Sequence, residues 1–225
     1  MISLKQYIAE ADTRSLIVVD IQPAYYPVSH KVLRGGGYLS RTYVKAADNI
    51  IDFINTRADR VLAYFNGSDS GLDDNITDVQ NHYLEMGLDP NKLDTINFQE
   101  KSYAFLRPWM DAEVPLRVII AAIRYMVQTR MHNSFEIPET TLREIISLST
   151  KYPAKTTRWK HHEYNELPRI LELDPIVIPD IDLSLLKQFS NAYISGGAQH
   201  ECLKEITIMM NAFNIKYTLV EDFIY

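Results

Sequence analysis

The sequence contains very little cysteine: among its 225 residues only Cys202 carries a thiol. A disulfide within the chain is therefore excluded, and so is a zinc cluster built from several thiolates. A lone thiol in an acidic protein is typical of a reducing compartment, so we expect a cytoplasmic location. Because no second cysteine can resolve a sulfenic acid within the chain, a thiol-based redox sensor is disfavoured.

Long apolar segments and clusters of basic residues are also lacking. No apolar run approaches the roughly 20 residues that span a bilayer, and the first residues, MISLKQYIAEADTRS, have no apolar signal-peptide core. The net charge is -6 and the pI is about 5.5. We therefore expect neither a membrane nor nucleic acid as a partner.

Short apolar runs alternate with segments of helical periodicity. The predicted strands cover residues 15–20, 60–65, 95–98, 191–195 and 216–220. The predicted helices cover residues 44–54, 113–131, 139–149 and a segment after 198, with Ser40 as the expected N-cap of the first. Strands that are apolar throughout are typical of parallel sheets covered by helices on both faces.

This pattern predicts the fold class and the domain organisation. We expect a three-layer α/β/α sandwich with a mostly parallel, Rossmann-like sheet of about five or six strands. The length suits a single domain over residues 1–225, with a divergent helical insertion at about 106–168.

Two residues, one at the end of a predicted strand and one at the start of a predicted helix, carry functional groups. Cys202 lies at or near the first turn of a predicted helix, where exposed amides and the helix dipole favour a thiolate and an oxyanion. The alternative is that Cys202 is a small buried apolar residue. Asp20 ends the first predicted strand, either as a base or as the cap of the following turn. Position alone leaves both alternatives open for each residue.

Two segments resemble the isochorismatase-like hydrolase superfamily. SLIVVDIQPAY (15–25) is similar to the opening strand of that superfamily, in which apolar residues precede Asp-Met-Gln and an aromatic residue. ISGGAQHEC (194–202) is similar to its second signature, an apolar strand, Gly, an apolar residue, Ala and, after three residues, the nucleophilic Cys. KYTLVED (216–222) resembles the strand that follows. The motifs stand in the right order on the right predicted elements, and the resemblance is weak between them.

The resemblance implies a role for several residues. Cys202 would attack an amide-like carbon to form a thioester, and Asp20 would accept the thiol proton. The backbone amides of Ala198 and Cys202 would form an oxyanion hole, and the Gly197–Ala198 peptide bond would be cis. The candidate substrate-binding residues are Gln22, Tyr25, Trp159 and His200.

The third catalytic residue of the superfamily is a lysine after the third strand. Lys101 follows the third predicted strand, and Tyr103-Ala104-Phe105 resembles the Ser-Ala-Phe of the family. The spacing is shorter than usual, and a strict alignment puts Gln99 in the lysine position. Lys155 and Lys160 are alternatives at a more usual distance from the nucleophile. Chain order favours Lys101, whose ammonium would stabilise both the carboxylate and the thiolate.

The sequence departs from the metal-binding members of the superfamily, which carry an Asp-x-His pair after the second strand. Here that segment offers Asp69, Asp73 and Asp74, and its first histidine is His82. We interpret it as a solvated acidic loop and expect no metal and no other cofactor.

Two functions from different classes follow. The first is a hydrolase that cleaves a small amide or related C–N bond through a thioester. Isochorismatases themselves usually lack the nucleophilic Cys, so the presence of Cys202 favours the amide-cleaving members of the superfamily. The alternative is a catalytically silent member with a structural or small-molecule-binding role, favoured by the missing metal motif, the displaced lysine and the mere 8 glycines. We expect a small-molecule substrate and a homo-oligomer, dimer or tetramer, since the chain stops at VEDFIY where family members continue.

Overall fold

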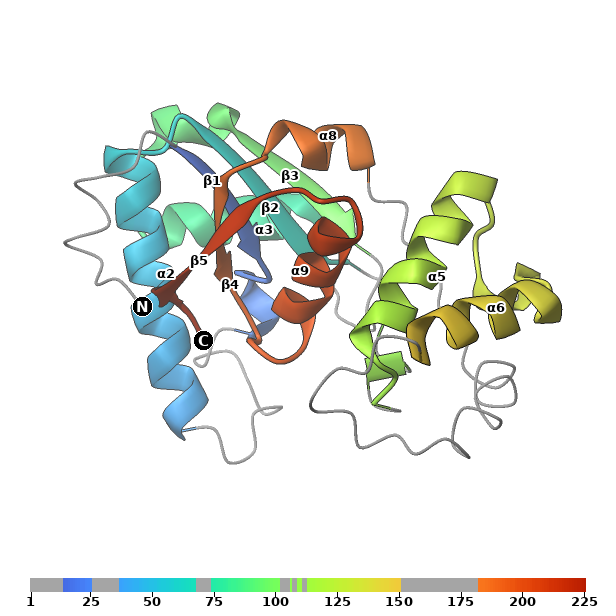
Figure 1. Ribbon diagram of the computed structural model, residues 1–225. Coiled ribbons are helices and arrows are strands. Elements are labelled where there is room, and N and C mark those ends of the chain that lie inside the picture. The colour runs from blue at the N-terminus through green and yellow to red at the C-terminus, as the bar shows by residue number, and fades with distance from the viewer. Residues whose placement is uncertain are drawn as a thin grey trace. The chain divides into compact units, whose positions relative to one another are not determined.

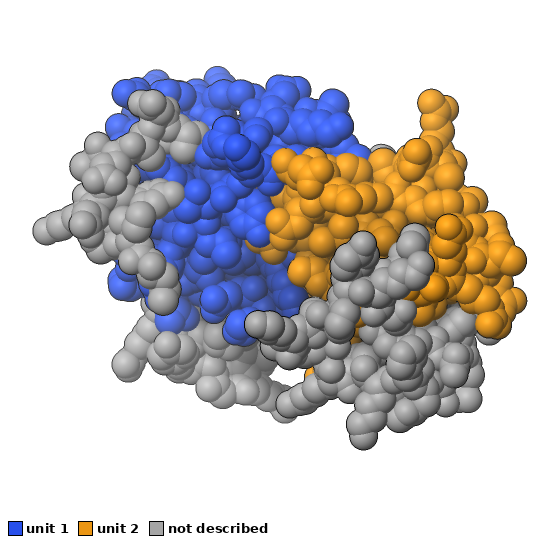
Figure 2. All heavy atoms as spheres, viewed as in Figure 1, with its two compact units in different colours: residues 1–103, 182–204, 215–225 blue, residues 104–181, 205–214 orange. Residues whose placement is uncertain are grey.

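The chain divides into two compact units (Figure 2). The computed structural model describes residues 14–25, 37–67, 74–101, 106, 109–110, 113–150 and 182–225, without the side chains of 37–41 and 148–150. Unit 1 comprises residues 1–103, 182–204 and 215–225, and unit 2 comprises residues 104–181 and 205–214. The insertion expected at about 106–168 falls within unit 2, which also includes ten residues near the C-terminus.

Unit 1 is built on a parallel sheet of five strands in the order β3-β2-β1-β4-β5 (Figure 1). The strands are β1 (Ser15–Val19), β2 (Arg60–Asn66), β3 (Ile96–Lys101), β4 (Ala192–Gly196) and β5 (Tyr217–Ile224). All four pairings between neighbours are parallel. The predicted α/β class with a mostly parallel, Rossmann-like sheet of about five or six strands is therefore confirmed.

Helices α2 and α3 cover one face of this sheet. Helix α2 spans Gly37–Thr56 and α3 spans Ile76–Glu85. A capping box starts α3, because the side chain of Asn75 accepts from the Asp78 amide while Asp78 accepts from the Asn75 amide. The prediction that Ser40 caps α2 is wrong: the helix begins at Gly37, so Ser40 has helical backbone geometry, whereas an N-cap requires non-helical dihedrals.

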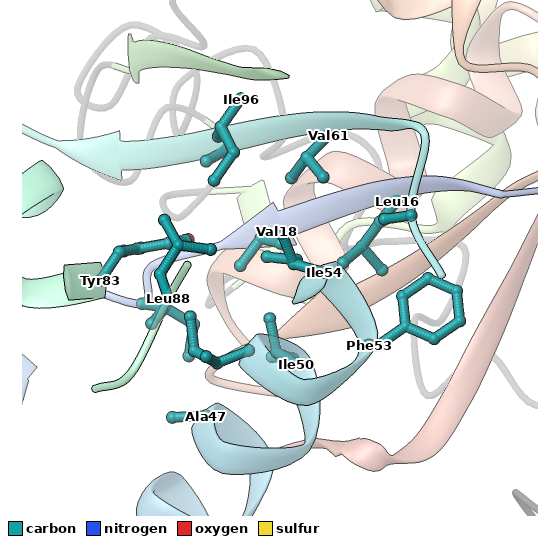
Figure 3. Close-up of a cluster of buried hydrophobic side chains, with 14 of the residues drawn as sticks. Leu16, Val18, Ala47, Ile50, Phe53, Ile54, Val61, Tyr83, Leu88 and Ile96 are labelled. Carbon is teal, nitrogen blue, oxygen red and sulfur yellow. The ribbon is translucent and has the colours of Figure 1, made fainter. Parts of the chain in front are cut away.

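The core of unit 1 explains the apolar pattern (Figure 3). Ala47, Ile50 and Ile54 of α2 recur at helical spacing and pack against alternate residues of the strands, such as Leu16 and Val18. The other face of β1 is buried as well, which is why the strand is apolar at every position. Each fully buried aliphatic side chain contributes roughly 1.5–3 kcal/mol to the free energy of unfolding.

Gly196, the last residue of β4, lies where two strands approach very closely. Its φ is +94°, and an added Cβ would lie 1.9 Å from the carbonyl oxygen of Val19 on β1. Both the dihedral and the contact with rigid backbone exclude a side chain here.

We expect Gly196→Ala to lower the free energy of unfolding by at least about 3 kcal/mol, measured by urea denaturation. Gly87→Ala is the matched control, because Gly87 has the same φ of +94° but nothing within 4 Å of its added Cβ. The control should lose only the dihedral cost of about 1–2 kcal/mol. Equal losses in both variants would show that the approach of β1 to Gly196 is unimportant.

Unit 2 is helical in the part that the structure describes. Helix α5 spans Leu116–Thr129 and α6 spans Glu139–Thr150, which confirms the helices predicted at 113–131 and 139–149. Arg124 of α5 donates to the carbonyl of Ala212 and to the side chain of Asn214 at 3.2 Å, at the C-terminal end of α9 (Cys202–Ala212). A cation there offsets the negative end of the helix dipole. None of the described helices combines the length and apolarity needed to cross a membrane.

Candidate active site

Four neighbouring strands of unit 1 end in one region, where the predicted residues Asp20 and Lys101 lie and the turn to Cys202 begins. Asp20 directly follows β1, Lys101 is the last residue of β3, and Gly196 ends β4 just before the turn to Cys202. Strand β2, which lies between β1 and β3, ends at Asn66, whose register partner on β3 is Lys101. The chain leaves β1 towards β2 but returns to the sheet on the other side, at β4. Such a switch in strand order is where open α/β sheets form their sites.

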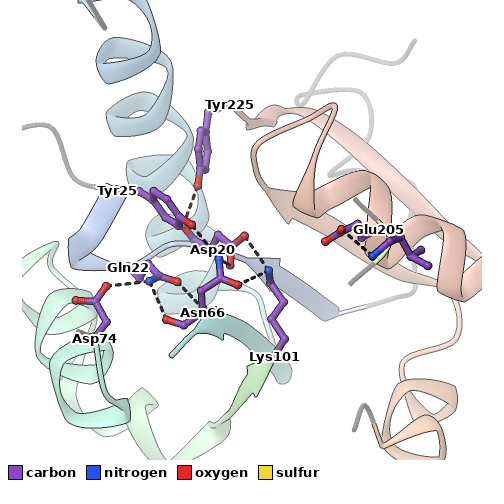
Figure 4. Close-up of polar contacts among 9 residues, drawn as sticks. Asp20, Gln22, Tyr25, Asn66, Asp74, Lys101, Glu205 and Tyr225 are labelled. Atoms are coloured by element: carbon purple, nitrogen blue, oxygen red, sulfur yellow. Dashed lines mark hydrogen bonds and ion pairs between the residues drawn. The ribbon is translucent and has the colours of Figure 1, made fainter. Parts of the chain in front are cut away.

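Asp20 and Lys101 form a buried ion pair (Figure 4). The ammonium of Lys101 lies 3.2 Å from Oδ2 of Asp20, and the two side chains are 0% and 1% exposed. Asn66 contacts both partners: its Oδ1 accepts from Nζ of Lys101 at 2.8 Å, and its Nδ2 donates to Oδ1 of Asp20 at 3.2 Å. The structure thus places Lys101 beside the acid. The alternatives Lys155 and Lys160 lie outside the described residues.

The Asp20 carboxyl experiences opposing electrostatic effects. Burial raises its pKa above the ordinary value of 3.8, while the charge of Lys101 and hydrogen bonds from Cys202, Lys101 and Asn66 oppose that rise. Burial is the largest effect, so the pKa stays raised. A carboxylate with a raised pKa binds a proton more readily than an exposed one, which suits a residue that accepts a proton during a reaction.

Cys202 is the first residue of α9 and is buried. Its thiol hydrogen bonds to the carboxylate of Asp20, so the predicted nucleophile and base are in contact. The preceding turn is held in place by its backbone: the Gly197 amide donates to the Val19 carbonyl at 3.0 Å, and the Ala198 carbonyl accepts from Leu203 at 3.3 Å. The Gly197–Ala198 peptide bond is cis, at the bond where the resemblance implies one.

The backbone of Asp20 is held in an uncommon conformation. Its φ of 57° lies in the left-handed region, which costs a non-glycine residue roughly 1–2 kcal/mol. Its amide donates to the carbonyl of Tyr64 at 2.9 Å, and its carbonyl accepts from the hydroxyl of Tyr225 at 2.8 Å. Strained residues that are held this way concentrate at functional sites.

The structure gives Gln22 and Tyr25 contacts within the protein. The side chain of Gln22 accepts from the Asn66 amide at 2.8 Å and donates to the Asn66 carbonyl at 3.1 Å and to Asp74 at 2.8 Å. The hydroxyl of Tyr25 accepts from Nδ2 of Asn66 at 2.9 Å. Both residues therefore support the end of β2, and their substrate-binding role stays a prediction. His200 is exposed in the turn before α9, and Trp159 lies outside the described residues.

The acidic segment after β2 is described only from Asp74 onwards, so Asp69 and Asp73 lie outside the description. Asp74 accepts from Gln22 and from the Ala24 amide, each at 2.8 Å, which makes it a support for the turn after β1.

Burial lowers the pKa of His82, whose Nε2 lies 3.2 Å from the hydroxyl of Tyr43. Within the described residues, no three His, Cys, Asp or Glu side chains gather in a way that could hold a metal ion.

Sequence reasoning missed Asn66 and Tyr225. Asn66 had a detectable signal, because it is the polar end of an apolar run, RVLAYFN, just as Asp20 is in SLIVVD. Tyr225 had none: its contact with the Asp20 carbonyl joins residues 205 positions apart.

Comparisons with known proteins add no identification, because no family model, curated protein or solved structure matches the chain.

Proposed function

We propose that the protein is a cysteine hydrolase of the isochorismatase-like type, which cleaves a small amide or related C–N bond through a thioester. The observation that carries the proposal is the contact between the Cys202 thiol and the buried Asp20–Lys101 ion pair. A nucleophile, a base and a cation that stabilises negative charge are the parts that such a reaction requires.

Stability alone accounts poorly for a buried ion pair. Removing an ammonium and a carboxylate from water costs several kcal/mol per ion, and apolar residues of similar size often stabilise a protein as well or better. The pair lies at the carboxyl ends of β1 and β3, beside a thiol and at a switch in strand order. Its position therefore favours a chemical role.

The reaction would proceed in two balanced halves. Cys202 transfers its proton to Asp20 while its sulfur bonds to the substrate carbonyl carbon; the C–N bond then breaks as Asp20 passes the proton to the leaving nitrogen. Water next attacks the thioester, Asp20 accepts the water proton, and the C–S bond breaks as that proton returns to sulfur. The amides of Ala198 and Cys202 are the proposed donors to the oxyanion in both halves.

Lys101 keeps its proton throughout this scheme. Its positive charge, 3.2 Å from Asp20, stabilises the negative charge that passes among carboxylate, sulfur and oxyanion. The proposal also includes a small-molecule substrate, a cytoplasmic location and a homo-oligomeric state, each a prediction from the sequence.

The proposal is tested by alkylation of Cys202 with iodoacetamide near neutral pH. Because the chain has one cysteine, mass spectrometry of the intact protein reports that residue alone. We expect the folded protein to react faster than the chain unfolded in urea, where the thiol has its ordinary reactivity. Slower reaction in the folded protein would indicate an inert buried thiol and would favour the catalytically silent alternative.

A further inference from the structure

Asn66 completes a closed ring of three side chains with the ion pair (Figure 4). Going round it, Nδ2 of Asn66 is 3.2 Å from Oδ1 of Asp20, Oδ2 of Asp20 is 3.2 Å from Nζ of Lys101, and Nζ is 2.8 Å from Oδ1 of Asn66. All three residues are buried. The ring joins the ends of β1, β2 and β3.

The charges in the ring determine the orientation of the amide. The carbonyl oxygen of Asn66 faces the ammonium, and its NH₂ group faces the carboxylate. Rotating the amide by 180° would place NH₂ against ammonium and oxygen against carboxylate, and both contacts would be repulsive. An asparagine thus offers one donor and one acceptor to two opposite charges without adding a charge of its own.

The backbone of Asn66 is held independently of the ring. Its amide donates to Oε1 of Gln22 at 2.8 Å, and its carbonyl accepts from Nε2 of Gln22 at 3.1 Å. The side chain therefore projects from a fixed point at the end of β2. An anchored amide can orient its neighbours, whereas the lysine side chain has four rotatable bonds to restrain.

We propose that Asn66 is a positioning residue: it holds the Lys101 ammonium against Asp20 and directs the Asp20 carboxylate to the thiol of Cys202. The inference rests on the proposed function only in that Asp20 is the proton acceptor. Asn66 itself forms no bond with the substrate and exchanges no proton.

The positioning has a consequence for the ionisation of Asp20. The hydrogen bond from Asn66 lowers the pKa of this carboxyl, against the larger rise caused by burial. Among the described residues, the other titratable groups that act electrostatically with Asp20 are Lys101, Cys202 and the phenols of Tyr43, Tyr83 and Tyr225. Burial raises the pKa of each phenol, so all three stay neutral while Asp20 titrates.

The test is a carbon-13 NMR titration of the protein labelled at the aspartate carboxyl carbons, with the Asp20 signal assigned by its loss in Asp20→Asn. Asn66→Leu keeps the approximate size of the side chain but removes donor and acceptor, and we expect the Asp20 midpoint to rise by about one pH unit. Asn66→Asp keeps the shape but places two carboxylates together, so the higher midpoint of that pair should rise at least as far. Asn49→Leu is the control, because Asn49 donates to the Asp222 carbonyl at 2.8 Å, in another contact of unit 1.

The same variants are alkylated with iodoacetamide as a function of pH. The pH at which the rate falls on the acid side should move upwards in both Asn66 variants and stay at the wild-type value in Asn49→Leu. If the Asp20 midpoint of Asn66→Asp, or of both variants, equals that of the wild type, the inference is overturned and Asn66 has a packing role. If Asn66→Leu fails to fold, the midpoint of Asn66→Asp decides. A shifted NMR midpoint in a protein whose Cys202 alkylates slowly would support the positioning role while contradicting the hydrolase function.

Discussion

Replacing Cys202 by serine should leave the protein folded and lower amide turnover by roughly 10³-fold or more. A serine hydroxyl has a similar shape, but it is a far weaker acid and a weaker nucleophile than a thiol at neutral pH. Asp20, which hydrogen bonds to the thiol, is too weak a base to ionise a hydroxyl at a useful rate. The measurement is ammonia release from a panel of small primary amides that includes nicotinamide.

The control for this variant is its free energy of unfolding, which urea denaturation should place within about 1 kcal/mol of the wild type. Cys202→Ala serves as a second variant and should be at least as inactive. Turnover that persists in Cys202→Ser and Cys202→Ala would show that the chemistry lies elsewhere in the protein.

The second large effect concerns the buried ion pair. Lys101→Met should lower the free energy of unfolding by about 3–5 kcal/mol near neutral pH, because it leaves the Asp20 carboxylate buried without its cation. Turnover should fall by roughly 10²–10⁴-fold, since loss of the cation raises the pKa of Asp20 and so increases its protonated fraction, which cannot accept the thiol proton. Urea denaturation and the ammonia assay measure the two effects.

The stability loss in Lys101→Met should depend on pH in a defined direction. The pKa of Asp20 is raised above 3.8 in the folded protein, and removing the cation raises it further. Between the unfolded and folded pKa values the folded state binds more protons, so the free energy of unfolding falls as pH rises through this window. The loss should therefore be small at about pH 4 and greatest above the folded pKa.

Two comparisons separate this effect from ordinary side-chain loss. The double variant Asp20→Asn/Lys101→Met removes both charges and should be more stable than Lys101→Met. Arg143→Met breaks an exposed pair with Glu139, whose side chains are 69% and 65% exposed, and should cost less than about 1 kcal/mol. A double variant that is no more stable than the single one would show that the charges of the pair are uncoupled.

Much of the fold was predictable because its signals are local. A strand buried on both faces must be apolar throughout, and a helix on a sheet must repeat its apolar residues every three to four positions. These patterns located β1, β2, β4, α5 and α6 to within a few residues. They missed α3, although the capping box of Asn75 and Asp78 is a local signal for its start. They also missed α8 (Leu183–Gln188), whose six residues are too few to show a period.

The edges of the elements were less predictable than their centres. Strand β3 was expected at 95–98 and extends to Lys101, because its last residues pair with Phe65 and Asn66 of β2. That pairing depends on a neighbouring strand and leaves no mark in the sequence of β3. The extension places Lys101 at the end of its strand, beside Asn66.

The sequence by itself determined the fold class and the places where chemistry was to be sought. Asp20 and Cys202 were recognisable because an acid ends an apolar strand and a thiol follows a glycine-rich turn, and both patterns are local. The tertiary structure decided the contact of Lys101 with Asp20, the ring closed by Asn66, and the use of Gln22 as a support for β2. These depend on strand order and register, which bring residues from 35 positions apart (Asn66 and Lys101) to 81 positions apart (Asp20 and Lys101) into contact. Pairing between distant strands is set by the packing of the whole sheet, so the spacing of residues along the chain carries no direct record of it.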